Sequence, residues 1–139
     1  MIVTIASGMV DALQRHACAD HPREACGLLF GSAGAITAAE PARNVATRSH
    51  HGFEIEPAAL LRAYRKARAD GHAVLGWYHS HPNGVAQPSV TDAARAVEDG
   101  KLWLIVTTDD VTAWTAVADG TGAADVLHDR FAPVVLRAV

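Results

Sequence analysis

Two histidines and an aspartate stand close together in one short run of the sequence, residues 78–92, which reads YHSHPNGVAQPSVTD. His79 and His81 are separated by one residue, so their side chains point to the same side of an extended chain. The loop that follows is long enough to fold Asp92 back beside both imidazoles. Two histidines and one carboxylate leave a fourth position open for water, which is the pattern of a catalytic zinc site.

The second half of the same run also has a simpler explanation. The segment SVTD, residues 89–92, fits a capping box at the start of a helix, where the Asp92 carboxylate would suit the helix dipole. This explains Ser89 and Asp92 without a metal. It leaves His79 and His81 unexplained, because an unpaired imidazole at the end of an apolar strand is costly. From spacing alone, both interpretations stay open.

Alternating helices and strands would have to position these residues. Helices are expected at 7–21 with Ser7 as the N-cap, at 56–71 between Pro57 and Gly71, and at 89–100. An apolar stripe on the middle helix is expected from Leu60, Leu61, Tyr64 and Ala67. Strands are expected at 25–31, 34–40, 73–78, 102–107, 111–117 and 133–139.

The order of these elements predicts the fold class. Helices and strands are interspersed, so we expect a mixed α/β (α+β) fold with a mixed sheet covered by helices. The apolar strands 73–78 and 102–107 flank a helix, which resembles a crossover unit with both sheet faces buried.

Length, net charge and cysteine content restrict the classes of protein to which this chain could belong. A chain of 139 residues is expected to form a single domain, 1–139. A net charge of -3 gives no basic field for nucleic acid. Two cysteines, Cys18 and Cys26, are too few for a disulfide scaffold. No signal peptide or membrane-length apolar segment stands out, so we expect a cytoplasmic protein.

Two further segments make the run recognisable. HPREACGLLFG lies at residues 21–31 and GFEIEP at 52–57. With them, the His-x-His-Pro, Ser and Asp spacing resembles the signature of the JAMM, or MPN-plus, zinc metallopeptidases, in a short bacterial form. The resemblance implies a curved mixed sheet between helices, similar to the MPN and cytidine-deaminase architecture.

The resemblance also implies roles for particular residues. His79, His81 and Asp92 would bind one Zn²⁺ ion, Ser89 would steady the reacting oxygen, and Glu24 would be the general base and acid. Spacing alone does not select Glu24 from the other glutamates. The resemblance further implies that His50, His51 and Phe53 lie near the site.

The implied activity is hydrolysis of an amide or isopeptide bond after the C-terminal Gly-Gly of a ubiquitin-like or sulfur-carrier protein. A general zinc peptidase and a non-catalytic MPN-type protein-binding domain are the alternatives, and a homodimer stays open. A zinc nucleobase deaminase is disfavoured, since the Pro-Cys-x-x-Cys signature is absent. The His-Glu-x-x-His metalloprotease helix is absent too.

Overall fold

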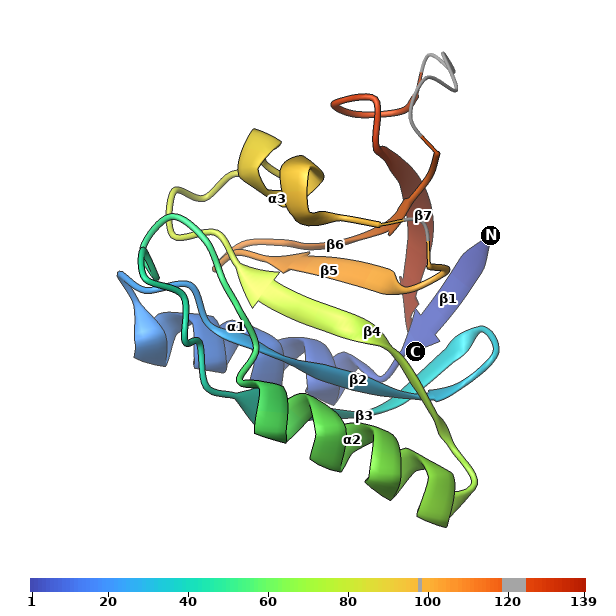
Figure 1. The fold of residues 1–139 in the computed structure, drawn as a ribbon. Coiled ribbons are helices and arrows are strands. Elements are labelled where there is room, and N and C mark those ends of the chain that lie inside the picture. Colours follow the sequence, from blue (N-terminus) through green and yellow to red (C-terminus); the bar gives the residue numbers. More distant parts are fainter. Residues whose placement is uncertain (98, 119–124) are drawn as a thin grey trace.

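A computed structural model describes residues 1–97, 99–118 and 125–139. The described elements are seven strands and three helices (Figure 1). In chain order they are β1 (Ile2–Ile5), α1 (Ser7–Asp20), β2 (Cys26–Ser32), β3 (Ala35–Ala42), α2 (Pro57–Asp70), β4 (Ala73–Ser80), α3 (Val90–Arg95), β5 (Leu102–Val106), β6 (Val111–Ala116) and β7 (Phe131–Ala138).

The strands form one mixed sheet in the order β1-β3-β2-β4-β5-β6-β7, and β7 pairs back with β1 to close a barrel. The hairpin of β2 and β3 is antiparallel, and so are the pairs β2–β4, β5–β6 and β6–β7. The pairs β4–β5, β1–β3 and β1–β7 are parallel. The predicted mixed, curved sheet flanked by helices is confirmed. Its closure was not predicted, because the four residues of β1 were not recognised as a strand.

Both faces of the sheet are packed. Leu13 and Ala17 of α1 lie in one apolar cluster with Leu104 and other strand residues. Ala63 and Ala67 of α2 lie in another cluster, against β2 and β4. α3 lies over β5 and β6 (Figure 1). None of the described helices is long and apolar enough to cross a membrane.

Three details of the predicted helices are wrong. The N-cap of α1 is Ala6, and Ser7 is already helical. The predicted stripe of α2 fails at Leu61 and Tyr64, which are 53% and 39% exposed. Alanines face the sheet instead, because only small side chains let this helix approach the strands closely. α3 ends at Arg95 rather than at Gly100, since Ala96 is already extended; residue 98 lies outside the described residues.

Strand pairing places the key segments at one end of the sheet. The crossover from β4 through α3 to the parallel strand β5 is confirmed. His79, near the end of β4, pairs across the sheet with Cys26 at the start of β2. The segment just before β2 and the end of β4 therefore meet, and the start of α3 lies near the same edge.

Candidate metal centre

Two histidine nitrogens and one carboxylate oxygen converge at the end of β4. Nε2 of His79 and Nε2 of His81 are 3.0 Å apart, and Oδ2 of Asp92 is 3.1 Å from each. The side chains are buried, His79 completely. The predicted ligand residues are thus brought together. Burying these polar atoms in a tight triangle is costly unless they share a proton or a cation.

The start of α3 delivers Asp92 to this triangle. Ser89 Oγ accepts a hydrogen bond from the Asp92 backbone N–H at 3.0 Å, and Asp92 Oδ2 accepts one from the Ser89 N–H at 2.8 Å. This is a complete capping box. The two interpretations of the sequence are therefore compatible, because one carboxylate caps the helix and also faces both imidazoles.

Hydrogen bonds orient one imidazole more firmly than the other. His81 Nδ1–H donates to the Val85 carbonyl at 2.9 Å, which turns Nε2 toward Asp92 and His79, where it is a ligand atom once deprotonated. His79 Nδ1 is buried and has no hydrogen-bond partner among the described residues. Its ring is instead stacked on Phe53, with centroids 4.2 Å apart and planes 18° apart.

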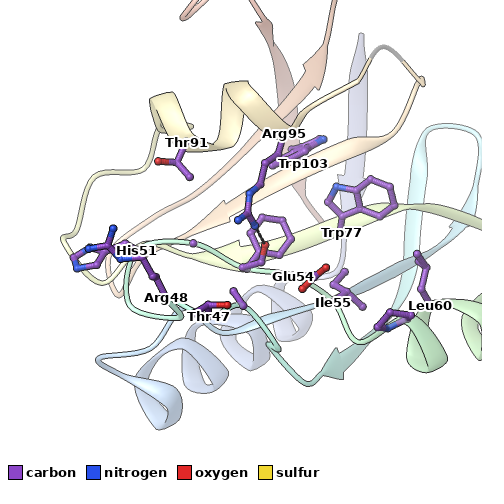
Figure 2. Close-up of a pocket in the computed structure, with 14 residues that line it drawn as sticks. Thr47, Arg48, His51, Glu54, Ile55, Leu60, Trp77, Thr91, Arg95 and Trp103 are labelled. Atoms are coloured by element: carbon purple, nitrogen blue, oxygen red, sulfur yellow. Dashed lines mark hydrogen bonds between the residues drawn. The ribbon is translucent and has the colours of Figure 1, made fainter.

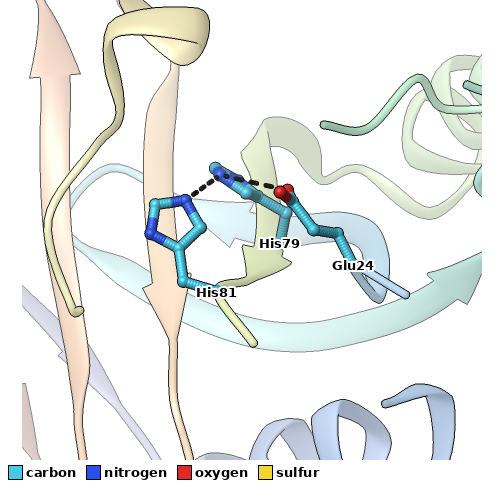
Figure 3. A group of neighbouring side chains, drawn as sticks. All are labelled: Glu24, His79 and His81. Carbon is cyan, nitrogen blue, oxygen red and sulfur yellow. Dashed lines mark hydrogen bonds and ion pairs between the residues drawn. The ribbon is translucent and has the colours of Figure 1, made fainter. Parts of the chain in front are cut away.

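Glu24 approaches the triangle from the segment before β2 (Figure 3). Its Oε1 lies 4.0 Å from His79 Nε2 and is buried without a hydrogen-bond partner among the described residues. With His79 and His81 it forms a group that could hold a metal ion. Burial raises the pKa of Glu24 to about 7. This carboxylate therefore lies beside the triangle without a polar partner of its own among the described residues.

The charges of the triangle favour an ionised aspartate. Burial raises the pKa of Asp92, but hydrogen bonds from His79 and His81 outweigh it and hold the pKa well below its usual range. Burial lowers the pKa of His79, the completely buried imidazole. For His81, burial also lowers the pKa, but the neighbouring Asp92 carboxylate more than compensates, so the pKa is raised. The site therefore keeps a fixed negative charge beside two imidazoles.

Comparison with known proteins decides the family. Residues 6–117 match the family described as prokaryotic homologs of the JAB domain. The chain belongs to this family. A desampylase of Haloferax volcanii is 34% identical over 113 residues, which cover 77% of this chain and 81% of the relative. A CysO-cysteine peptidase of Mycobacterium tuberculosis is 32% identical over 113 residues, covering 78% and 75%.

Solved structures agree with the JAB-domain assignment. The crystal structure of a JAB1/MPN domain protein from Archaeoglobus fulgidus is similar over 99% of this chain and 98% of that one, with a TM-score of 0.63 and 20% identity. At that identity the likeness shows the fold alone. It confirms the MPN-type fold that the motifs implied.

Next to the triangle, this JAB domain has a cleft of about 800 Å³ (Figure 2). Trp77 and Trp103 line it from β4 and β5, and Arg95 lines it from α3. Phe53 lines it from the loop before α2 and also covers the His79 ring. Arg95 Nη1 donates to the Phe53 carbonyl at 2.7 Å. Phe53 and Trp103, whose rings contact His79, therefore lie between the cleft and the metal-capable group, whose own residues do not line it. The cleft is of a size that binds ligands.

The structure places the two histidines of the loop before α2 differently. His51 lines the cleft, whereas His50 is exposed outside the metal-capable group. Ser80, between the two histidines, accepts a hydrogen bond from the Ala25 N–H at 2.8 Å, so its hydroxyl bonds to the backbone. Asn44, whose side chain donates to the Glu24 carbonyl, was not predicted from the sequence. A lone asparagine before an irregular segment carries no motif that would have singled it out.

Proposed function

We propose that this protein is a zinc-dependent peptidase or isopeptidase that hydrolyses the amide bond after the C-terminal Gly-Gly of a ubiquitin-like or sulfur-carrier protein. The convergence of the Glu24 carboxylate with the triangle of His79, His81 and Asp92 carries the proposal. The relatives named as a desampylase and a CysO-cysteine peptidase support the substrate class. In this proposal residues 1–139 act as one peptidase domain.

The donor atoms fit zinc. Zinc bonds histidine nitrogen and carboxylate oxygen at about 2.0–2.1 Å, so two donors at tetrahedral angles lie about 3.3 Å apart. The edges of the triangle are 3.0, 3.1 and 3.1 Å. Small side-chain adjustments would therefore admit the ion. Two imidazoles with one carboxylate also suit zinc chemically.

The residues around the triangle then have complementary tasks. A zinc ion held by His79, His81 and Asp92 would supply the Lewis-acid chemistry that makes water a nucleophile near neutral pH. Glu24, the unpartnered carboxylate beside the triangle, takes a proton from the attacking water and returns it to the leaving amine. The Ser89 oxygen accepts a hydrogen bond from Asp92, which leaves its own O–H to donate to the developing oxyanion.

Replacing the proposed base tests the reaction. We expect Glu24→Gln to keep one zinc per chain and to lose hydrolysis of sulfur-carrier fusions that carry an internal Gly-Gly, because an amide cannot accept the proton. The measurements are metal content by elemental analysis and cleavage by mass spectrometry, with wild type, with and without chelator, as the reference. Hydrolysis at the wild-type rate in Glu24→Gln would refute the assigned role.

Replacing the proposed carboxylate ligand tests the metal site. We expect Asp92→Ala to lose zinc, since it removes one of three ligands. Exposed Asp109 lies in the bend between β5 and β6 and belongs to neither the triangle nor the metal-capable group, so Asp109→Ala is the matched control that should bind zinc normally. Unchanged zinc content in Asp92→Ala would show that this carboxylate only caps α3. Cleavage of unrelated short peptides but of no diglycine-linked protein would favour a general peptidase.

A further inference from the structure

A loop between β3 and α2 reaches the proposed active site. We call residues 44–55 the Asn44 loop. Its two ends are joined by a β-bridge between Asn44 and Ile55, and by a hydrogen bond from the Val45 N–H to the Glu54 carbonyl at 2.9 Å. Compact loops with adjoining ends often carry function. This one contributes Phe53, whose ring lies on the His79 imidazole.

The Asn44 carboxamide makes four hydrogen bonds. Its Nδ2 donates to the Glu24 carbonyl at 2.8 Å and to the Gly52 carbonyl at 3.1 Å. Its Oδ1 accepts from the N–H groups of Ala46 at 3.0 Å and Glu54 at 3.1 Å. An asparagine side chain has two donors and two acceptor sites, so its capacity is filled. Two carbonyls and two N–H groups around it also fix which end is oxygen.

The backbone of Glu24 is held from both sides. Its N–H donates to the Ser49 carbonyl at 2.7 Å, and its carbonyl accepts from Asn44. The next residue, Ala25, exchanges two hydrogen bonds with Ser80 on β4. The Glu24 Oε1 atom itself has no hydrogen-bond partner among the described residues. The direction of this carboxylate therefore depends on how firmly its backbone is fixed.

We propose that Asn44 is a positioning residue: its carboxamide ties the Glu24 backbone to the loop that holds Phe53 against His79, and so fixes the base relative to the cleft. This inference deepens the proposed function and rests on it. Asn44 touches neither the triangle nor the reacting atoms. It acts through Glu24 on proton transfer and through Gly52 and Phe53 on the wall of the cleft.

Two substitutions at Asn44 separate its contacts. Asn44→Asp keeps an oxygen for Ala46 and Glu54 but loses the donor to Glu24. Asn44→Ala loses all four hydrogen bonds. The matched control is Gln14→Glu on α1, where a similar amide donates to the Thr107 carbonyl at 3.3 Å, away from the cleft. That control removes the same kind of bond and adds the same charge.

We expect both Asn44 variants to bind one zinc per chain and to show kcat lowered about 10- to 100-fold, because small misplacements of a catalytic group have effects of that size. KM should rise as well, since the cleft wall loosens. Gln14→Glu should keep the wild-type kcat and KM. Global destabilisation alone would reduce the active fraction and leave KM unchanged, so the pattern of kcat and KM separates the two causes.

Hydrogen exchange gives a readout independent of activity. The amides of Ala46 and Glu54 should lose protection in Asn44→Ala and keep it in Asn44→Asp, whereas the Glu24 amide should exchange faster in both variants. Asn44→Asp keeps the test usable if Asn44→Ala does not fold. Wild-type kcat and KM in a zinc-loaded Asn44 variant would overturn the inference while leaving the proposed function intact.

Failure of the proposed function would look different. Wild type would cleave no diglycine-linked substrate, or Glu24→Gln would remain active. The role of Asn44 in positioning a base would then fall with it, and the exchange data would decide only whether Asn44 fixes the Glu24 backbone: unchanged protection of the Glu24 amide in both Asn44 variants would exclude this, and faster exchange would support it.

Discussion

At the scale of single residues, Asp92 makes contacts both at the start of α3 and with the two imidazoles. Its Oδ2 caps α3 by accepting from Ser89 and also faces the imidazoles of His79 and His81. A carboxylate with that many donors keeps its negative charge although it is buried. The hydrogen bonds that cap α3 therefore also hold Asp92 as an anion in a position where it could bind a metal cation.

Ser89 has a structural and a proposed catalytic contribution that a substitution can separate. We expect Ser89→Ala to cost about 1 kcal/mol of folding stability through the lost cap, and to lower kcat about 100-fold through the lost oxyanion donor. Ser89→Thr, which retains a hydroxyl, should preserve most of both. Denaturant titration and steady-state kinetics on zinc-loaded protein measure the two effects. A Ser89→Ala variant that is less stable but equally active would leave Ser89 as a cap only.

Some residues of the proposed site could be predicted from the sequence, and others could not. Spacing made His79, His81 and Asp92 candidates, because their separation is short and local, but it left the capping box as an alternative for Asp92. Glu24 could not be chosen over other glutamates, since its place depends on the pairing of Cys26 with His79 across β2 and β4. The four bonds of Asn44 are also made by the fold, so nothing local marks that residue.

At the scale of elements, the close contact between β2 and β4 depends on Gly27. A Cβ atom there would lie 2.3 Å from the Glu40 carbonyl oxygen and 2.4 Å from the Tyr78 ring. Tyr78 precedes His79, a proposed ligand, and its hydroxyl is 2.8 Å from His16 Nδ1 on α1. The missing side chain at Gly27 thus lets Tyr78 link the sheet to α1 next to the proposed metal centre.

Two glycine substitutions with opposite effects test this packing. We expect Gly27→Ala to destabilise the protein by about 1–3 kcal/mol through overpacking. Gly8→Ala on α1 should instead stabilise it by about 0.5 kcal/mol, because nothing lies within 4 Å of the added Cβ and alanine favours helix. Urea midpoints compare the two. Equal midpoints for Gly27→Ala and wild type would show that the strands can shift to accept a side chain.

Elements were predictable where local patterns were strong. The strands β2, β4 and β5 are continuous apolar runs, and α2 has Pro57 and Gly71 at its ends. β1 is too short for a periodic pattern to stand out. On the buried face of α2, Leu60 and Ala67 were predicted correctly, whereas Ala63 was missed and the exposed Leu61 and Tyr64 were wrongly included.

At the scale of the whole molecule, the sheet closes through β1 and β7, so strands distant in sequence support one another. The proposed metal centre adds a further tie, since its ligands come from the end of β4 and the start of α3. An ion that binds only the folded state stabilises it by mass action, by about 2.7 kcal/mol at a hundredfold excess over Kd.

Chelation should therefore lower thermal stability. We expect EDTA to reduce the Tm of zinc-loaded wild type by several degrees, in line with about 2–4 °C for each kcal/mol in a chain of this size class. Glu24→Gln should respond as wild type does, whereas Asp92→Ala should already melt at the lower temperature. Differential scanning calorimetry measures the shift. A Tm of wild type that chelator does not change would argue against a metal that spans β4 and α3.

Because the three donor atoms at the end of β4 lie so close together, we expect metal binding to release a proton. The two ring nitrogens lie 3.0 Å apart, and each is 3.1 Å from the same carboxylate oxygen. Three lone pairs at these distances repel one another, so in metal-free protein the three atoms would share at least one proton. A metal ion needs those lone pairs and must expel that proton. The heat of binding then includes the ionisation heat of whichever buffer receives the proton, and the affinity for metal weakens as the solution becomes more acidic.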